Sequence, residues 1–279
     1  MEKLIITVAG VGAETTREQQ PNLPVTPPEI GVDAARCAEA GASVFHLHVR
    51  DAAGAPTQDK EVFAAAIDEI RKRTDIIIQT STGGAMGMTA DERLQPLELD
   101  PEMASLTTGT GNFGPDVFFN DQELIETFYR RMIEKGVRPE FEIFEAGQID
   151  NALRLMKKFG PPGPLAHWDF VLGVPGTMMG EPRTLTFLVD SIPANLRERS
   201  TWTCTGIGRW HMPVTMTALA LGGNVRLGFE DNVFYHKGVP ADGNAQLVAR
   251  VVRLAREWGR EPATPDEARR ILKLAPHDK

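Results

Sequence analysis

Short apolar runs alternate with amphipathic segments along the whole chain of 279 residues. Runs of about four to eight residues that are rich in β-branched side chains and end in glycine, proline or small polar residues favour buried strands. Eight segments follow this pattern and are each expected to contain one strand: 4–9, 43–49, 75–84, 102–110, 140–147, 165–172, 200–205 and 224–230.

A segment with apolar residues at helical spacing follows each predicted strand. The expected helices lie at 28–40, 60–72, 89–97, 122–135, 148–159, 184–192, 213–221 and 244–258, and a further C-terminal helix is expected at 265–274. No linker or change in composition divides the chain. Regular alternation over this length predicts an α/β fold, a single-domain (β/α)8 TIM barrel spanning residues 1–279, rather than an open doubly wound sheet. The first strand also lacks the Gly-x-Gly-x-x-Gly turn of a dinucleotide-binding fold.

The composition narrows the class of function. The chain is 42% hydrophobic and 24% charged, with a net charge of −8. An acidic balance argues against nucleic acid and against anionic membrane surfaces as partners. No signal-peptide pattern and no apolar stretch of about 20 residues is found, and the two cysteines suggest no disulfide framework. A cytoplasmic enzyme is therefore expected.

His46 and His48 are the most informative residues of the chain. They lie two positions apart in an apolar predicted strand, so their side chains project from the same face, about 6–7 Å apart along the backbone. Two imidazoles so placed can bind one zinc ion at Zn–N distances of about 2.0–2.1 Å. The alternative is a pair of hydrogen-bonded core histidines. His167, His236 and His277 are expected to be packing or surface residues.

The last predicted strand ends in a second group of polar residues. Arg226, Gly228 and Glu230 are expected on one strand face, with Asp231 beside them. Since catalytic residues of a barrel lie at the carboxyl ends of its strands, Glu230 is a candidate third zinc ligand. Arg226 and Asp231 could abstract a proton from carbon, with the carboxylate as base and the guanidinium stabilising an enolate. The alternative is a structural salt bridge.

Other predicted strand ends are also polar. Ser81 to Gly84 offers hydroxyls and backbone N–H groups that suit an anion, although an ordinary strand-to-helix turn has the same composition. Glu142 alternates with apolar neighbours and is expected to point into the barrel. Arg209 follows the seventh strand, where barrels often bind phosphate, and is expected to meet a nucleotide phosphate of a cofactor.

Several motifs occur together and in order, and with them the chain closely resembles the β-keto acid cleavage enzyme family. They run through nearly the whole sequence: Gly12-Ala-Glu14-Thr-Thr-Arg17, Gln20-Pro-Asn-Leu-Pro24, His46-Leu-His48, Ser81-Thr-Gly-Gly84, Gly206-Ile-Gly-Arg-Trp-His211, Gly228-Phe-Glu-Asp-Asn232 and Tyr235-His-Lys-Gly238.

The resemblance implies a zinc-dependent barrel that condenses a β-keto acid with acetyl-CoA, giving acetoacetate and a new acyl-CoA. It implies 3-keto-5-aminohexanoate, an intermediate of lysine fermentation, as the substrate, 3-aminobutyryl-CoA as the product, and a homotetramer. The implied metal ligands are His46, His48 and Glu230, and the implied catalytic pair is Arg226 and Asp231. The implied substrate contacts are Ser81, Gly84, Ser105, Thr107, Glu142 and, for the amino group, Glu14. Thr107 and Ser105 depart from residues of close relatives, which carry Asn at the first position and in some cases Thr at the second.

Two alternatives to this function are considered. One is a zinc hydrolase of the amidohydrolase type, in which the histidine pair normally lies on the first strand; here the pair is on the second. The other is a non-catalytic metal-binding or ligand-binding barrel. Bound zinc together with acetyl-CoA-dependent formation of acetoacetate would distinguish the three.

Overall fold

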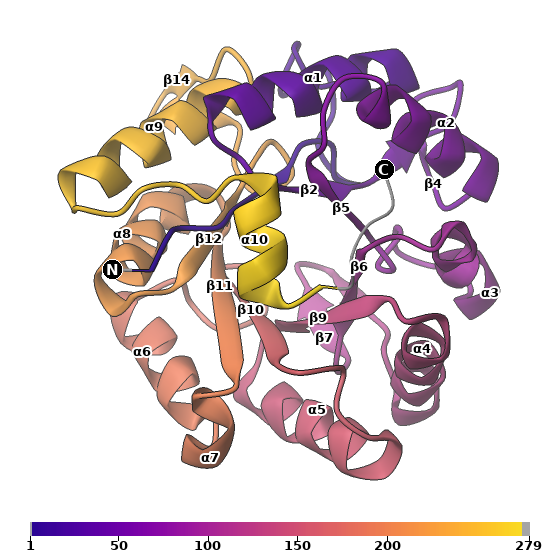
Figure 1. Ribbon diagram of the computed structural model, residues 1–279. Helices are drawn as coiled ribbons and strands as arrows, with labels where there is room; N and C mark the ends of the chain where they lie inside the picture. The colour runs from indigo at the N-terminus through magenta and orange to yellow at the C-terminus, as the bar shows by residue number, and fades with distance from the viewer. Residues whose placement is uncertain (1, 275–279) are drawn as a thin grey trace.

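A closed barrel of parallel strands forms the centre of the computed structural model, which describes residues 2–274 (Figure 1). The strands follow one another around the barrel in chain order, and the last pairs with the first. They are β1 (Ile6–Ala9), β2 (Val44–Leu47), β5 (Ile77–Thr80), β6 (Met103–Thr107), β9 (Arg138–Ile143), β10 (Ala166–Leu172), β11 (Ser200–Gly206) and β12 (Asn224–Leu227). The predicted (β/α)8 barrel is therefore confirmed.

Helices surround the barrel on the outside, except the last one, which lies across one of its ends (Figure 1). They are α1 (Pro27–Ala40), α2 (Lys60–Arg71), α3 (Ala90–Leu94), α4 (Gln122–Lys135), α5 (Ala146–Phe159), α6 (Pro182–Ser191), α7 (Ala194–Arg197), α8 (His211–Leu221), α9 (Asn244–Glu257) and α10 (Pro265–Leu272). Two 3₁₀ turns, Gln95–Leu99 and Gly208–Trp210, extend α3 and precede α8. No helix within residues 2–274 has the length and apolar character needed to cross a membrane.

Local signals account for where the helices begin and end, as α1 illustrates. The Thr26 side chain accepts a hydrogen bond from the backbone of Glu29, whose carboxylate accepts one from the backbone of Thr26 in return. This capping box satisfies two N–H groups that the first helical turn leaves free. Gly41 ends the helix at φ 115°, a left-handed conformation that glycine adopts without the steric cost of a Cβ atom.

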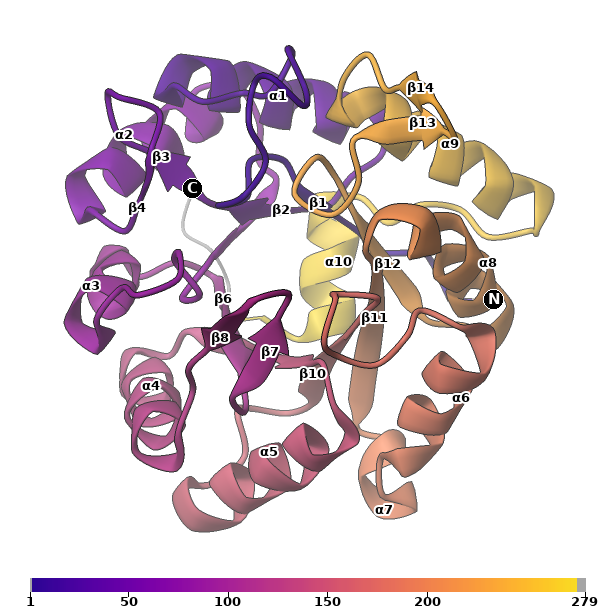
Figure 2. The same cartoon turned by 180° about the vertical axis from the view of Figure 1, so that it is seen from behind.

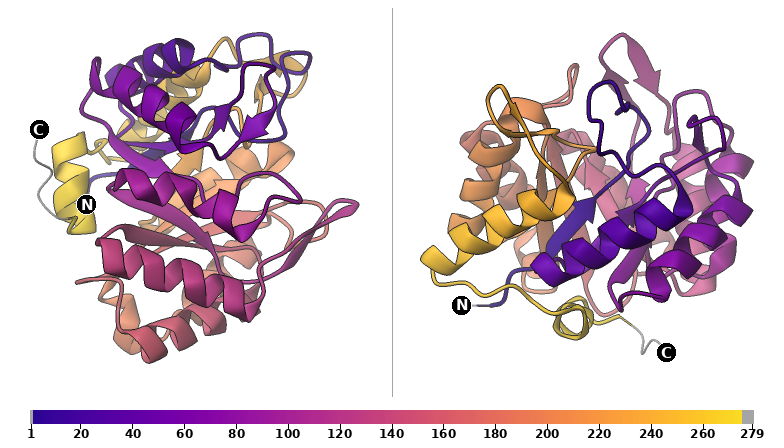
Figure 3. Two further views of the ribbon diagram at one scale, coloured as in Figure 1. Left: turned by 90° about the vertical axis from the view of Figure 1, so that its right-hand side faces the viewer. Right: turned by 90° about the horizontal axis from the view of Figure 1, so that it is seen from above.

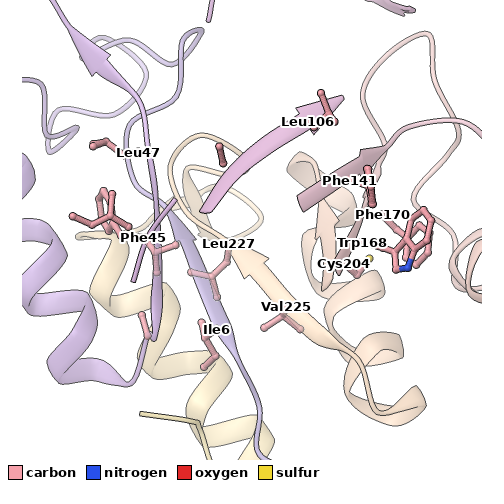
Figure 4. Close-up of a cluster of buried hydrophobic side chains, with 14 of the residues drawn as sticks. Ile6, Phe45, Leu47, Leu106, Phe141, Trp168, Phe170, Cys204, Val225 and Leu227 are labelled. Carbon is pink, nitrogen blue, oxygen red and sulfur yellow. The ribbon is translucent and has the colours of Figure 1, made fainter. Parts of the chain in front are cut away.

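The main hydrophobic core lies between the barrel and the helices. Because successive strand residues face opposite sides of a sheet, alternate apolar residues point outward into this layer. Figure 4 shows some of them: Ile6, Phe45, Leu47, Leu106, Phe141, Trp168, Phe170, Cys204, Val225 and Leu227. The intervening residues point into the barrel, which puts every polar strand residue discussed above on the inner face.

The amino-terminal end of the barrel is closed by apolar side chains. Ile5, Val44, Ile77 and Met103 form a second buried cluster with residues of α10. Figure 1 shows α10 lying across this end of the barrel. Arg138 ties the helix down, since its guanidinium donates to the carbonyl of Leu272 at 3.1 Å. This end of the barrel is therefore filled, and a cavity has room only at the other end.

Three hairpins rise from the carboxyl ends of the strands, on the face seen in Figure 2 and at the edge opposite α10 in Figure 3. They are β3 (Val49–Arg50) with β4 (Pro56–Thr57), β7 (Gly111–Phe113) with β8 (Asp116–Phe118), and β13 (Phe234–His236) with β14 (Val239–Pro240). None of the three was expected from the sequence. Their strands are two or three residues long, which is too short for hydrophobic alternation to be recognised.

Two expectations about the elements need correction. The single helix expected at 89–97 is the short helix α3 followed by a 3₁₀ turn, because Pro96 lacks the N–H that would continue the α-helical bonding. Strand β12 ends at Leu227 and does not reach Glu230. Of the remaining histidines, His167 is buried and His236 is exposed, while His277 lies outside the described residues.

Candidate active site

His46 and His48 lie on the inner side of the barrel, at and just beyond the end of β2. Their ring centroids are 5.2 Å apart. The Nδ1 atom of His46 lies 2.6 Å from the Oε1 atom of Gln79, which is its register partner on β5. Donation of that N–H to the Gln79 carbonyl oxygen leaves the Nε2 lone pair of His46 directed into the cavity. This is how a neighbouring group orients a metal-binding imidazole.

Glu230 completes a group of three possible metal ligands. Its carboxylate oxygens lie 3.8 Å from Nε2 of His46 and 3.7 Å from Nε2 of His48. One ligand atom from each of the three residues lies within 4.8 Å of the others. The Oε2 atom of Glu230 is buried and has no hydrogen-bond partner among the described residues. A buried carboxylate oxygen left without a donor fits a site that receives a cation, and two imidazoles with one carboxylate suit catalytic zinc.

Glu230 reaches this position from a turn and not from the end of a strand. Gly228 has φ 143°, and a Cβ atom there would collide with the backbone of Ala9. The chain then turns, with the N–H of Asp231 donating to the carbonyl of Gly228 at 3.0 Å and that of Glu230 to the carbonyl of Ala9 at 3.1 Å. The expected strand face shared by Arg226, Gly228 and Glu230 is therefore wrong, because the turn interrupts the two-residue period.

Arg226 is the centre of a buried charge network. Its Nε and Nη2 atoms lie 3.2 and 3.0 Å from the two carboxylate oxygens of Asp231. Its Nη1 atom donates to Glu142 at 3.1 Å, and Nη2 also donates to Glu230. Asp169 lies 3.8 Å from the same guanidinium. One cation thus links the candidate metal ligand, the candidate base and two further acids, and fixes their relative positions.

The surroundings shift the protonation of these groups in opposite directions. Burial, reinforced by Arg226, lowers the pKa of His46 to about 3, so its imidazole is neutral and able to bind a metal. Burial would raise the pKa of Glu230, but Arg226 and the two histidines outweigh it and hold that pKa at about 2. For Asp231, burial and the charge of Glu230 outweigh Arg226 and raise the pKa to about 7. An ionised ligand and a base that titrates near neutrality therefore lie side by side.

These residues form the floor of a cavity of about 450 Å³ at the carboxyl end of the barrel. Its floor is charged and polar, whereas its outer wall is largely apolar. The wall comes mainly from segments beyond the barrel strands, with Val171 near the end of β10. Its apolar residues are Met86, Phe113, Pro115, Phe118, Phe144, Val171, Val174, Pro175 and Ile207. A volume of this size suits a small ligand with a charged end and an apolar remainder.

Most of the residues implied as substrate contacts reach this cavity. Glu14, Ser81, Gly84 and Glu142 line it. Thr107 lies beside Glu142 and donates a hydrogen bond to its carboxylate at 2.8 Å. Thr107 itself is not a lining residue, and neither are Ser105 and Arg209, the other two expected ligand contacts. Ser105 is buried beneath the lining, where its carbonyl accepts a hydrogen bond from the Thr82 hydroxyl at 2.7 Å.

Arg209, expected to contact a cofactor phosphate, does not line the cavity. It is exposed beyond the end of β11, and its guanidinium lies over the Trp210 ring at 4.6 Å. It can therefore meet only a ligand that extends out of the cavity.

Several residues of the site were not recognised from the sequence, among them Gln79, Arg50 and Arg93. Gln79 lies in β5, two positions before Ser81, which directly follows the strand, so the two-residue period could have placed it on the inner face with His46. Arg50 and Arg93, which support the loops around the cavity, gave no sequence signal. A buried arginine that bonds backbone carbonyls far along the chain cannot be distinguished by pattern from a solvated one.

The fold and the site together define a class: barrel enzymes whose cavity can hold a metal ion next to a carboxylate base. The chain belongs to the beta-keto acid cleavage enzyme family, whose sequence profile matches residues 3–274. The resemblance inferred from the motifs is thereby confirmed, and the family is one of enzymes.

Individual relatives match this chain over nearly their full length. A protein of Fusobacterium nucleatum named 3-keto-5-aminohexanoate cleavage enzyme is 53% identical over 276 residues, 98% of this chain and 99% of that protein. A protein of the same name from Acetoanaerobium sticklandii is 52% identical over 277 residues, 99% and 100% of the two chains. The 3-oxoadipate:acetyl-CoA acetyltransferase of Cupriavidus necator is 37% identical over 271 residues, 97% and 94% of the two chains.

Solved structures support the fold alone. The apo structure of ObcA superposes with a TM-score of 0.79 at 22% identity, covering 91% of this chain and 66% of that chain.

Proposed function

We propose that the protein condenses 3-keto-5-aminohexanoate with acetyl-CoA to give acetoacetate and 3-aminobutyryl-CoA. The observation that carries the proposal is the meeting of the His46, His48 and Glu230 group with the Arg226–Asp231 pair in one cavity. The choice of substrate rests on the two full-length relatives that bear its name. The alternatives of an amidohydrolase-type hydrolase and a non-catalytic barrel find no support in these relatives.

His46, His48 and Glu230 would hold zinc, and zinc, when bound, supplies Lewis acidity that makes the ketone of the β-keto acid easier to attack and the neighbouring C–H more acidic. Asp231 accepts the proton from the carbon between the ketone and the carboxylate. Arg226 keeps the Asp231 carboxylate directed at that proton and stabilises its charge. A base whose pKa lies near neutrality is well matched to this transfer.

The remaining bond changes exchange two acyl groups. The carbon nucleophile formed on proton loss attacks the thioester carbonyl of acetyl-CoA, and the CoA thiolate leaves. That thiolate then attacks the original ketone carbon, and the bond between this carbon and its neighbour breaks. The released carbon takes the proton back from Asp231, so that acetoacetate and the new acyl-CoA form with no net gain or loss of protons.

Glu14 would bind the ammonium group of the substrate. Its carboxylate lines the cavity on the loop between β1 and α1. Arg50, which is 6% exposed, supports this loop by donating to the carbonyls of Gly12 at 3.0 Å and Thr15 at 2.8 Å, on either side of Glu14. The acidic side chain is thereby held at the cavity entrance, where the charge of Arg50 acts on it without forming an ion pair within 4 Å among the described residues.

The opposite end of the substrate is a carboxylate, and the segment from Ser81 to Gly84 would receive it. Ser81, Gly84 and Glu142 line the cavity, and Thr107 donates a hydrogen bond to Glu142. Ser105 would contribute from beneath, since its carbonyl holds the Thr82 hydroxyl. Arg209 at the outer rim would contact a phosphate of acetyl-CoA, whose nucleotide must extend out of the cavity.

We further propose that one barrel domain comprises residues 1–279 and that the protein works as a homotetramer in the cytoplasm. The assembly rests on the resemblance to the family, and the location rests on the two cysteines, which suggest no disulfide framework. Light scattering during size-exclusion chromatography tests the first, and fractionation of the producing cells tests the second.

The decisive experiment is a panel of β-keto acids offered with acetyl-CoA, with each acyl-CoA product identified by mass and bound metal measured on the same preparation. We expect 3-aminobutyryl-CoA and acetoacetate in equal amounts. The proposal is wrong if protein with a full complement of zinc makes no acetoacetate from any member of the panel. If acetoacetate forms only from other β-keto acids, the reaction stands and the assigned substrate is wrong.

A further inference from the structure

Arg93 is a buried cation directly behind the cavity wall. It belongs to α3 and is 4% exposed. Its guanidinium donates to the carbonyl of Thr82 at 2.7 Å, the carbonyl of Phe119 at 3.1 Å and the side-chain oxygen of Asn120 at 2.7 Å. The side chain thus joins two segments that are far apart along the chain.

These two segments carry different parts of the cavity. Thr82 lies in the Ser81–Gly84 segment, whereas Phe119 and Asn120 directly follow the β7–β8 hairpin. The guanidinium carbon of Arg93 also lies 5.0 Å from the centre of the Phe118 ring, which lines the cavity. One side chain therefore contacts both the polar segment proposed to receive the carboxylate and the apolar wall.

The backbone of the Ser81–Gly84 segment is fitted closely to this arrangement. A Cβ atom added at Gly84 would lie 3.5 Å from Cγ of Arg93, and one added at Gly83 would lie 3.6 Å from the Phe118 ring. Gln58 adds a further connection, since its amide donates to the carbonyl of Ser81 at 3.0 Å. A shift of Arg93 would be transmitted to the segment directly, because little space separates them.

The three acceptors of Arg93 are all uncharged, and none of the ion pairs within residues 2–274 includes this residue. A second ring, that of Phe128, lies 5.0 Å from the guanidinium. Burial lowers the pKa of Arg93 to about 10, so the group remains a cation at neutral pH. The charge of Glu142 opposes this shift, so that carboxylate acts on Arg93 without a direct ion pair. Burying a cation with no carboxylate in contact is costly, and such a cost is commonly retained where the group has a role in function.

We propose that Arg93 is a positioning residue, which sets the Ser81–Gly84 segment against the β7–β8 hairpin so that the two enclose the carboxylate end of the β-keto acid. The inference rests on the proposed function for the identity of the ligand, and on the contacts above for the positioning itself. Acetyl-CoA would extend out of the cavity. Its binding is therefore expected to depend less on the relative position of these two segments.

The test compares Arg93→Met with Arg260→Met. Arg260 is a matched control, since it is 2% exposed and donates to the backbone carbonyls of Gly223, Glu2 and Lys3 at the closed end of the barrel. We expect Arg93→Met to raise the KM for the β-keto acid at least tenfold and to change the KM for acetyl-CoA less than twofold. Arg260→Met is expected to lower the melting temperature and to leave both KM values within twofold.

Hydrogen exchange provides a readout that does not require turnover. In Arg93→Met, the backbone amides of residues 81–88 and 111–119 are expected to exchange at least fivefold faster than in the unmodified protein, with no such change in Arg260→Met. If the unmodified protein forms no acetoacetate, the proposed function fails, and the exchange rates still decide whether Arg93 positions the two segments.

Three results would overturn the inference. One is unchanged exchange in both segments of Arg93→Met. Another is an equal rise in KM for the β-keto acid in Arg260→Met, which would reflect general loss of stability. The third concerns Arg93→Lys, which keeps the charge but cannot reach all three acceptors. We expect this variant to recover less than half of the affinity for the β-keto acid that Arg93→Met loses. Full restoration by lysine would show that charge acts and positioning does not.

Discussion

The Nη2 atom of Arg226 lies 3.0 Å from Oδ1 of Asp231, while Nε of the same guanidinium lies 3.2 Å from Oδ2. This two-point contact fixes the plane of the carboxylate as well as its position. Because Arg226 also donates to Glu142 and Glu230, the candidate base cannot rotate without disturbing the candidate metal site. Proton transfer and metal binding are thus linked through one side chain.

Replacement of the candidate base provides the most direct test of the proposed chemistry. Asp231→Asn is expected to lower kcat by about 100- to 10,000-fold, the usual contribution of a general base. The KM for the β-keto acid should change little, because Asn preserves the volume of the side chain. Steady-state kinetics measure both. Asp116→Asn is the control, since Asp116 lines the same cavity on the β7–β8 hairpin without bonding Arg226; an equal loss there would contradict the role of Asp231.

Gln79 should affect metal binding without touching the metal. Gln79→Leu leaves Nδ1 of His46 without its acceptor, and loss of such an orienting group typically weakens metal affinity about 10–100-fold. Competition with a chromophoric zinc chelator measures the affinity. Gln58→Leu removes another buried glutamine at the same end of the barrel and should leave zinc affinity unchanged. Normal zinc affinity in Gln79→Leu would rule out the orienting role.

Glu14 is expected to select for the amino group of the substrate. Glu14→Gln should raise the KM for 3-keto-5-aminohexanoate about fivefold, the change that corresponds to about 1 kcal/mol for a partly solvated ion pair. The same β-keto acid without its amino group should be used equally well by both proteins. Glu18→Gln removes another exposed acid of this loop and is the matched control. Equal losses on the two substrates would exclude an ammonium contact.

The stability of the protein should depend on pH through Asp33. Burial raises the pKa of Asp33 from 3.8 to about 6, against the opposing effect of a hydrogen bond from Asn244. The folded state therefore binds this proton more tightly than the unfolded state. The stabilisation is complete below about pH 4 and is lost as the pH rises through 6, by at most about 1.4 kcal/mol per pH unit.

Urea unfolding between pH 4 and pH 7 tests this sign. The difference in unfolding free energy between Asp33→Asn and the unmodified protein should grow in favour of the variant as the pH rises. Asp68→Asn, an exposed substitution on α2, should show a constant difference. A constant difference for Asp33→Asn as well would show that its carboxyl group does not titrate with folding.

The barrel and the histidine pair could be predicted because both depend on short-range periodicity. His46 and His48 share a face of β2 for the same reason that Phe45 and Leu47 share the opposite one. Regular alternation of strands and helices then leaves few arrangements, and the parallel strands of such a barrel have all their carboxyl ends on one side.

The position of Glu230 could not be predicted from strand periodicity. Its distance from the histidines depends on the turn at Gly228, whose conformation is dictated by close approach to the backbone of Ala9. Ala9 lies in β1, at the other end of the chain. Glu230 could be selected as a ligand from its residue type and place, but its route to the site could not be predicted from a period of two.

The apolar wall was missed for a related reason. Phe113 and Phe118 lie in a segment too short and too polar to be recognised as strands, and their hairpin is supported from elsewhere in the chain. The N–H of Gly114, for example, donates to the carbonyl of Pro175 at 2.7 Å. Contacts between loops of distant origin leave no periodic trace in the sequence.

The separation of a charged floor from an apolar wall has a consequence for how such a protein can change. The floor is built by barrel strands and by the turn after β12, whereas much of the wall is built by the β7–β8 hairpin and the loop after β10. Exchange of those two loops would reshape the space above the floor while leaving Arg226, Asp231 and the three possible ligands undisturbed. A single reactive centre can in this way be adapted to acids of different length and polarity, and loop grafting is the natural route to new specificities on this scaffold.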